Sequence, residues 1–150
     1  MRIIVIEDNE LYKNELLRCL EQEESDIEIV GSASNGAEGL ALTEKLIRDN
    51  LTPDVIFTDV WMPEMDGFEM IEALQRRGIS CKIVVTSSCP EFLYAKRAME
   101  LGAVDFLVKP LKVYEVRNVL GRLRRELESE KKWKHILNLE YIFLNAMAGK

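Results

Sequence analysis

The sequence has few cysteines and no long apolar run, and both absences narrow the class of protein. Its three cysteines, Cys19, Cys81 and Cys89, are odd in number and show neither a metal-binding nor a redox spacing, which predicts reduced thiols. No apolar run approaches the ~20 residues of a membrane span. The apolar run at residues 3–6 is also too short for a signal peptide. We therefore expect a cytoplasmic chain that does not enter a membrane.

An excess of positive charge is also lacking. The chain has 20 Lys and Arg residues against 26 Asp and Glu residues, and its formal net charge is -6 at pH 7. A general surface for nucleic acids or anionic membranes needs Lys and Arg to face phosphate groups. We therefore expect no DNA or membrane binding by this chain itself. The composition of the 150 residues is 47% hydrophobic and 31% charged. These fractions are ordinary for one soluble globular domain with a short appendage.

Short apolar runs alternate with helical patterns along the chain. The predicted strands cover residues 3–6, 27–31, 55–58, 82–86 and 104–108. The predicted helices cover about residues 11–24, 37–47, 68–77, 92–101 and from 113 onward. This alternation implies parallel βαβ units and a sheet covered on both faces. The predicted fold is α/β and flavodoxin-like: a doubly wound five-stranded parallel sheet of order 2-1-3-4-5, with a C-terminal helical extension.

Polar side chains stand where these strands end. Asp59 follows a buried apolar run, and Glu7 and Asp8 follow the first strand. In the order 2-1-3-4-5, strands one and three are neighbours, so these three carboxylates meet at the edge where open α/β sheets bind ligands. Ser87 and Lys109 end strands four and five on the same rim. A lone Asp at a strand end is more often a loop cap, but four further polar residues at three other strand ends favour a functional group.

Three carboxylates in one crevice repel one another unless a cation lies between them. Mg²⁺ prefers hard oxygen ligands, and we expect no histidine or thiol nearby that would select zinc. A lysine and a hydroxyl on the same rim add a positive charge and a hydrogen-bond donor. These are the groups needed to hold a transferring phosphoryl group, and a carboxylate can serve as the nucleophile that forms an acyl phosphate.

The chain resembles a receiver domain of a two-component response regulator over roughly residues 1–125. The residues that carry the resemblance are Glu7-Asp8, Asp59 with Met62-Pro63 and Asp66-Gly67, Ser87, and Lys109-Pro110. The resemblance implies that Asp59 accepts a phosphoryl group from a sensor histidine kinase, with Mg²⁺ or Mn²⁺ as cofactor. It also implies a role in the protein's own phosphorylation and dephosphorylation, without activity on an outside substrate.

The resemblance also assigns the other site residues. Asp8 becomes the main metal ligand, Glu7 assists through water, and Asp59 and the backbone carbonyl of Trp61 complete the protein ligands. Ser87 contacts the phosphoryl group. Lys109 pairs with that group and is followed by a cis peptide bond to proline.

Three positions depart from the usual pattern of the family. Glu7 stands where Asp is more common, and it is expected to act through water. Trp61 is unusually large, and we hypothesise that it shields the acyl phosphate from water. Thr86 and Ser87 both carry hydroxyls, so the switch residue is ambiguous by one position. We favour Ser87 because it lies 22 residues before Lys109, the usual spacing in the family.

Phe106 lies three residues before Lys109, at the aromatic switch position of the family. A core aromatic on the fifth strand is the plainer interpretation, but the surrounding pattern favours the switch. The resemblance implies that phosphorylation draws Ser87 toward the phosphate and turns the aromatic ring inward. The face formed by helix four, strand five and helix five then changes partners, which controls dimerisation or release of an output domain.

Residues 126–150 form a predicted helical extension toward an output domain outside this chain. Their charged run is more often a solvated helix face than a binding patch, and the spacing of residues 116, 120, 123 and 127 is compatible with a short coiled-coil seam. The apolar cluster 133–144 is expected to pack on the receiver, on a second copy or on a downstream domain. The segment resembles the linker of AraC-type (YesN-like) response regulators, in which a separate domain binds DNA.

Two other functions fit part of the sequence. An aspartate-nucleophile phosphohydrolase normally has a second Asp two residues after the nucleophile, where this chain has Trp61. An unphosphorylated pseudo-receiver would act only as an interaction module, and the intact set of Asp8, Asp59, Ser87 and Lys109 argues against it. Both alternatives can be tested with a small phosphodonor.

Overall fold

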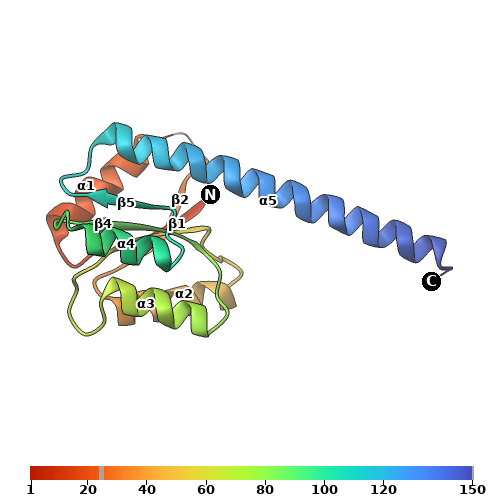
Figure 1. The fold of residues 1–150 in the computed structure, drawn as a ribbon, viewed down its shortest axis with the longest axis horizontal. Helices are drawn as coiled ribbons and strands as arrows, with labels where there is room; N and C mark the ends of the chain where they lie inside the picture. The colour runs from red at the N-terminus through yellow and green to blue at the C-terminus, as the bar shows by residue number, and fades with distance from the viewer. Residues whose placement is uncertain (24–25, 150) are drawn as a thin grey trace.

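The computed structural model describes residues 1–23 and 26–149, in which five strands alternate with five helices (Figure 1). The strands are β1 (Arg2–Ile6), β2 (Glu28–Ala33), β3 (Val55–Asp59), β4 (Lys82–Ser87) and β5 (Asp105–Val108). The helices are α1 (Glu10–Glu21), α2 (Gly36–Arg48), α3 (Gly67–Arg76), α4 (Phe92–Glu100) and α5 (Val113–Met147). The predicted alternation of strand and helix is therefore confirmed.

All strand pairs are parallel, and the strand order is β2-β1-β3-β4-β5. This is the predicted flavodoxin-like order. The neighbours β1 and β3 pair up to Ile6 with Thr58, and Asp59 pairs with Thr86 of β4. The residues that follow β1 and end β3 are thus brought together, as the sequence predicts for the central edge of such a sheet.

The two faces of the sheet pack on different helices (Figure 1). Ile4 and Ile6 of β1 join the core under α2, α3 and α4, whereas Ile3 and Val5 join the core under α1 and α5. Successive strand residues point to opposite faces, so a continuous apolar run is what a doubly covered strand requires. The run of four β-branched residues is therefore explained by burial on both sides.

The predicted element ends differ from the observed ones by a few residues. β2 ends at Ala33 rather than Gly31, and both β3 and β4 include the polar residue that was expected just after them, Asp59 and Ser87 respectively. α1 ends at Glu21, and its predicted end at residue 24 lies outside the described residues. Hydrophobic pattern marks where a strand is buried, but backbone pairing extends the strand beyond that point.

The pair Asp66-Gly67 opens a helix, whereas its sequence predicts a turn. Asp66 is the N-cap of α3: its side chain accepts a hydrogen bond from the backbone N–H of Glu69, and the Glu69 carboxylate accepts one from the backbone N–H of Asp66. This reciprocal capping box fixes where α3 begins. The loop between β3 and α3 is therefore held at its far end by the helix.

α5 is 35 residues long and runs well past the body of the domain (Figure 1). Its first half buries Val116, Leu120 and Leu123 against the sheet. The stripe at residues 116–127, whose spacing is also compatible with a coiled-coil seam, therefore packs on the receiver core instead. Of the helices within residues 1–23 and 26–149, none combines the length and hydrophobicity that crossing a bilayer requires.

Candidate functional site

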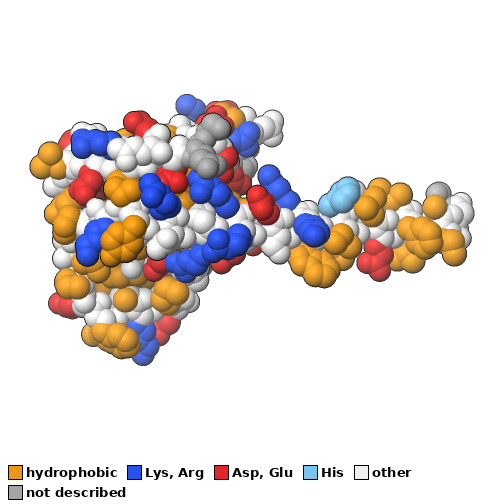
Figure 2. All heavy atoms as spheres, turned by 90° about the horizontal axis from the view of Figure 1, so that it is seen from above, with side chains coloured by type: hydrophobic (Ala, Val, Ile, Leu, Met, Phe, Trp, Pro, Cys, Tyr) orange, Lys and Arg blue, Asp and Glu red, His pale blue; other side chains and the backbone are white. Residues whose placement is uncertain are grey.

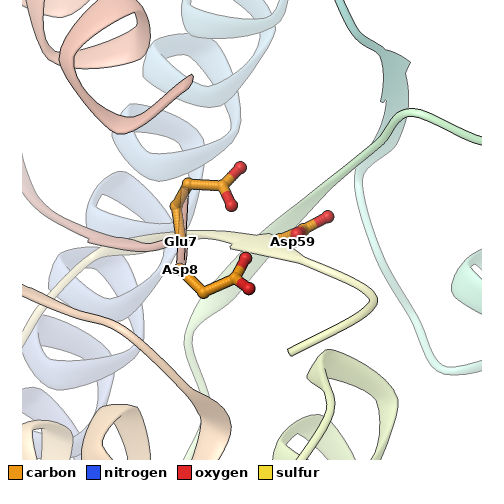
Figure 3. A group of neighbouring side chains, drawn as sticks. All are labelled: Glu7, Asp8 and Asp59. Atoms are coloured by element: carbon orange, nitrogen blue, oxygen red, sulfur yellow. The ribbon is translucent and has the colours of Figure 1, made fainter. Parts of the chain in front are cut away.

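Three carboxylates gather at the C-terminal edge of the sheet (Figure 3). Glu7 and Asp8 follow β1, and Asp59 is the last residue of β3. One ligand oxygen from each side chain lies within 4.8 Å of the other two. Glu7 and Asp59 are buried, and Asp8 is exposed. Two neighbouring strand ends thus supply the predicted acidic cluster.

Lys109 lies against this cluster with its side chain only 3% exposed. Its ammonium group pairs with a carboxylate oxygen of Glu7 and lies 3.1 Å from Oδ1 of Asp59. The residue follows β5, and its backbone N–H donates to the carbonyl of Ser87 at the end of β4. The Lys109–Pro110 peptide bond is cis, as the resemblance implied. One positive charge therefore balances part of the negative charge at this edge.

Glu7 is the carboxylate most affected by its surroundings. Burial raises the pKa of Glu7 to about 7, and the nearby charge of Asp59 acts in the same direction. Hydrogen bonds from Lys109 and from the backbone N–H of Asn9, the latter at 3.1 Å, lower the pKa in opposition. Loss of hydration outweighs these contacts because a carboxylate cut off from water favours its neutral form. Without a cation, Glu7 is close to half-protonated at neutral pH.

Asp59 is held by its own strand and loop. Its Oδ1 accepts a hydrogen bond from the backbone N–H of Val60 at 2.9 Å, and its carbonyl accepts one from the hydroxyl of Thr58 at 2.9 Å. Gly67 lies directly behind, and a Cβ there would stand 2.1 Å from the Asp59 carbonyl oxygen. The N–H of Val60 thus orients the carboxylate, while Thr58 and Gly67 hold the backbone that carries it.

The two candidate hydroxyls on β4 have different partners. Thr86, the partner of Asp59 in the sheet register, is buried and directs its hydroxyl to the carbonyl of Thr58 at 3.4 Å. The hydroxyl of Ser87 accepts from the backbone N–H of Cys89 at 3.0 Å and lies 3.3 Å from the Cys89 carbonyl. Thr86 is thus engaged within the sheet and Ser87 with the loop before α4. The switch role of Ser87 stays a prediction.

A cleft opens above the cluster and is framed by aromatic rings. It is lined by Glu7, Asp8, Asn9, Tyr12, Asp59, Trp61, Ser88, Cys89, Pro90 and Lys109. Trp61 is 56% exposed, and its ring meets that of Tyr94 on α4 edge to face, with the ring centroids 5.5 Å apart. The loop after the acidic residue of β3 therefore touches α4 through these two rings.

The sequence did not identify Tyr12 as a neighbour of the site, and it did not place Cys89 there. The Lys109 ammonium lies 4.5 Å from the centroid of the Tyr12 ring, in the range of a cation–π contact. Asn9 caps α1 by accepting from the N–H of Tyr12 at 3.1 Å, which places that ring on the first helical turn. The expectation that no thiol lies nearby is wrong, since Cys89 lines the cleft.

The donor atoms suit a hard divalent cation. Among the described residues, the cluster that could hold a metal consists of three carboxylates and includes neither Cys89 nor a histidine. Mg²⁺ and Mn²⁺ accept such oxygen sets, whereas zinc favours nitrogen and sulfur. Exposed Asp8 and buried Asp59 leave one open side to the cluster, where water or a phosphate oxygen can complete the coordination.

Phe106 lies on β5, next to Val85 of β4 in the register. Its ring is half-buried and packs against the core under α2, α3 and α4. Both the core interpretation and the switch interpretation require this location, so the role of the ring as a switch stays a prediction.

Comparison with known proteins finds the same fold and sequence pattern. The family described as "Response regulator receiver domain" matches residues 3–121. The transcriptional regulatory protein BtsR of Escherichia coli K12 is 36% identical over 126 residues, covering 84% of this chain and 49% of BtsR. YesN of Bacillus subtilis, an uncharacterised transcriptional regulatory protein, is 30% identical over 139 residues, covering 90% of this chain and 36% of YesN. The chain thus spans half or less of the length of these relatives.

Solved structures agree with the sequence comparisons. The REC domain of AraT, a response regulator from Geobacillus stearothermophilus, has a TM-score of 0.74 at 28% identity, covering 87% of this chain and 97% of that one. The response regulatory domain of mrkE from Klebsiella pneumoniae has a TM-score of 0.73 at 30% identity, covering 86% and 99%. The chain therefore belongs to the response regulator receiver domains of two-component signalling, with transcriptional regulators among its relatives.

Proposed function

We propose that Asp59 is the phosphoacceptor of this receiver domain and that a sensor histidine kinase is the donor. An oxygen of Asp59 forms a bond to phosphorus while the bond from phosphorus to the donor nitrogen breaks, which yields an acyl phosphate. Oδ1 is engaged by Lys109 and by the N–H of Val60, so we expect Oδ2 to attack. The observation that carries this proposal is Lys109, buried against two of three clustered carboxylates.

Each neighbour has a role in holding the transferred group. Lys109 is near enough to shift from carboxylate to phosphoryl oxygen, which offsets the added negative charge. Asp8, Asp59, the Trp61 carbonyl and, through water, Glu7 would hold Mg²⁺ or Mn²⁺. When bound, the cation screens the carboxylates and the phosphoryl oxygens from one another. Ser87 would donate its hydroxyl to the phosphoryl group after releasing the carbonyl of Cys89, to which that hydroxyl donates in this structure.

The output is a change of the face formed by α4, β5 and α5. Movement of Ser87 would break its contacts with the loop before α4, and Phe106 would turn toward the space this leaves. We assign residues 1–125 to the receiver and residues 126–150 to a linker toward a DNA-binding output domain outside this chain. The relatives BtsR and YesN are transcriptional regulatory proteins, which supports transcription regulation as the endpoint.

Mass measurement after incubation with a small phosphodonor and Mg²⁺ tests the proposal. We expect a gain of one phosphoryl group that is lost in Asp59→Asn and strongly slowed in Lys109→Ala. Continuous turnover of a phosphoester would instead favour the phosphohydrolase alternative. Failure to gain any phosphoryl group, together with no Mg²⁺ binding, would identify a pseudo-receiver.

Trp61 gives a second measurable property of the site. The exposed ring lies beside the cleft and is supported by Tyr94, so it can cover an acyl phosphate on Asp59. We expect Trp61→Ala to shorten the lifetime of the phosphorylated protein several-fold, because water then reaches phosphorus more easily. An unchanged rate of autodephosphorylation would show that the ring does not shield the group.

A further inference from the structure

The projecting part of α5 carries a dense set of exposed apolar side chains (Figure 2). Nine large side chains between residues 133 and 147 are each 42–73% exposed. We call this set the apolar belt; its members are Trp133, Ile136, Leu137, Leu139, Tyr141, Ile142, Phe143, Leu144 and Met147. Monomeric soluble proteins rarely expose contiguous apolar patches above a few hundred Å². The apolar belt therefore needs a partner.

The receiver core does not supply that partner. The stripe of α5 that faces the sheet through Leu120, Leu123 and Leu127 continues, at helical spacing, through Lys134, Asn138, Tyr141 and Asn145, of which only Tyr141 belongs to the apolar belt. At ~100° per residue, the centre of the apolar belt is turned roughly 140° away from this stripe. Where α5 passes beyond the body, its sheet-facing side is thus polar except for Tyr141, and most of the apolar belt lies on its other sides.

The attachment of α5 to the body ends just before the apolar belt. Lys82 at the start of β4 pairs with Glu126, 3.5 Å away, and with Glu130, one helical turn further along. Leu127 is partly buried between them, against the core under α1 and α5. The next turn brings Trp133, which is 61% exposed. The ion pairs thus fix the direction in which α5 leaves the receiver.

We propose that the apolar belt docks against the same belt of a second copy of this chain. A two-helix contact can reach six members of the belt, each 42–73% exposed, and these offer on the order of 700 Å² per chain; they are Trp133, Ile136, Leu139, Ile142, Phe143 and Met147. Specific stable interfaces begin at about 600 Å² from each partner. In a two-fold arrangement the same residues serve both copies, so one patch is sufficient for both sides of the interface.

Polar flanking residues favour a parallel pairing of the two helices. Glu140 is the acidic residue between Trp133 and Met147. When Ile136, Leu139 and Phe143 form the contact, Glu140 takes a flanking position that faces His135 of the second copy, as in the flanking pairs of parallel coiled coils. The polar stripe of Lys134, Asn138 and Asn145 then stays in water. Both receivers lie at the same end of such a dimer.

This inference deepens the proposed output, dimerisation, but assembly through the belt requires no phosphoryl group. The dimer would hold two receivers at a fixed separation before any signal arrives. Phosphorylation would then alter how the two α4-β5-α5 faces meet. A failure of the belt to associate and a failure of Asp59 to react are therefore separate observations.

The molar mass of the full 150-residue chain in solution tests the inference. Light scattering over about 5 to 100 µM is expected to give twice the chain mass of 17.3 kDa for the unchanged protein. The double variant Ile136→Lys/Phe143→Lys is expected to be monomeric. The matched control Asn138→Lys/Asn145→Lys adds the same charges at the same seven-residue spacing on the polar stripe and is expected to stay dimeric.

Phosphorylation of Asp59 in each variant reports whether the receiver is folded, because the belt lies outside the receiver core. A monomeric wild-type chain over the whole range would overturn the inference and favour a downstream segment as the cover. A dimer that survives both lysines in the belt would also overturn it, since the contact would then lie elsewhere. Loss of phosphorylation in every variant with the dimer intact would refute the proposed function alone.

Discussion

Lys109 is placed by contacts from three separate parts of the chain. Glu7 follows β1, Asp59 ends β3, and Tyr12 lies in the first turn of α1. The two carboxylates could be anticipated because they stand at strand ends. Tyr12 could not, since a tyrosine on a helix gives no sign of which side chain its ring will meet. The one feature of the sequence that bears on the position of Tyr12 is Asn9, because its capping role fixes where the helix starts.

The Tyr12 ring is expected to tune phosphorylation through Lys109. Replacing Tyr12 by Leu keeps an apolar side chain but removes the ring face, and a partly desolvated cation–π contact contributes about 1 kcal/mol. We expect the rate of phosphorylation by a small phosphodonor to change about three- to tenfold in Tyr12→Leu. Tyr12→Phe keeps the ring and should match the wild type. Equal rates in the Leu and Phe variants would exclude this role.

Glu7 is expected to make the binding of Mg²⁺ dependent on pH. Its folded-state pKa of about 7 lies above the ordinary value of 4.5. This group therefore stabilises the metal-free protein most below pH 4.5, and that contribution is lost as the pH rises through 7. A cation prefers the ionised carboxylate, so it must displace the proton in acid.

The affinity for Mg²⁺ is expected to fall about tenfold between pH 8 and pH 6, as loss of one proton with a pKa near 7 requires. Calorimetric titration at both values of pH measures the change. Glu7→Gln carries no proton in this range and provides the control. A pH dependence that persists in Glu7→Gln would assign the titration to another group.

At the scale of elements, the junction between β3 and α3 decides the geometry of the acidic cluster. The capping box of Asp66 and Glu69 fixes the start of α3, and Gly67 lets that start lie against the end of β3. The sequence pair Asp-Gly indicated a break in the chain at this point. Only the packing of the two elements shows that a helix begins at this break and that its start lies against the Asp59 carbonyl.

Gly67→Ala tests this packing. Its Cβ would stand 2.1 Å from the backbone oxygen of Asp59, so either the helix or the strand end must move. We expect a loss of about 1–3 kcal/mol in the free energy of unfolding and slower phosphorylation of Asp59. Chemical denaturation and the mass assay measure the two effects.

Gly121→Ala is the matched control. Gly121 lies inside α5, and a Cβ there would meet only the tip of Arg125 at 3.6 Å. Alanine is the better helix former, so this variant should gain about 0.5–1 kcal/mol. If the two variants shifted stability by the same amount and sign, the close approach of Gly67 would have no consequence.

At the scale of the whole molecule, α5 is one helix with two environments. Its first half lies against the sheet, with Val119, Leu120 and Leu123 fully buried, and its second half extends into solvent. An isolated helical segment of about 12–15 residues is marginal in water. The second half therefore depends on association through the apolar belt for its stability, whereas the first half depends on the receiver core.

Amide hydrogen exchange separates the two halves. In Ile136→Lys/Phe143→Lys we expect residues 133–147 to exchange at least tenfold faster than in the wild type, because the monomeric segment frays. Residues 116–123 should keep their protection, since the receiver core holds them. Exchange that speeds up equally along the whole helix would mean that the variant had damaged the receiver.

The sequence alone determined the layers, the strand order and the acidic edge. Runs buried on both faces must be central parallel strands, and the ends of such strands meet at one edge, so Glu7, Asp8 and Asp59 had to lie close together. Lys109 lies at the same edge because it directly follows another parallel strand, β5. These properties follow from local pattern and chain connectivity, which a linear sequence records directly.

Only the tertiary structure decided which side chains face each other across elements. It assigned the stripe at residues 116–127 to the sheet instead of a coiled coil, and it brought Tyr12 to Lys109 and Trp61 to Tyr94. It also left the apolar belt uncovered. The physical reason is that the sequence of a helix contains its apolar periodicity but does not specify which surface packs against the apolar stripe. Which surface fills each stripe depends on how the helix is rotated and where the body ends.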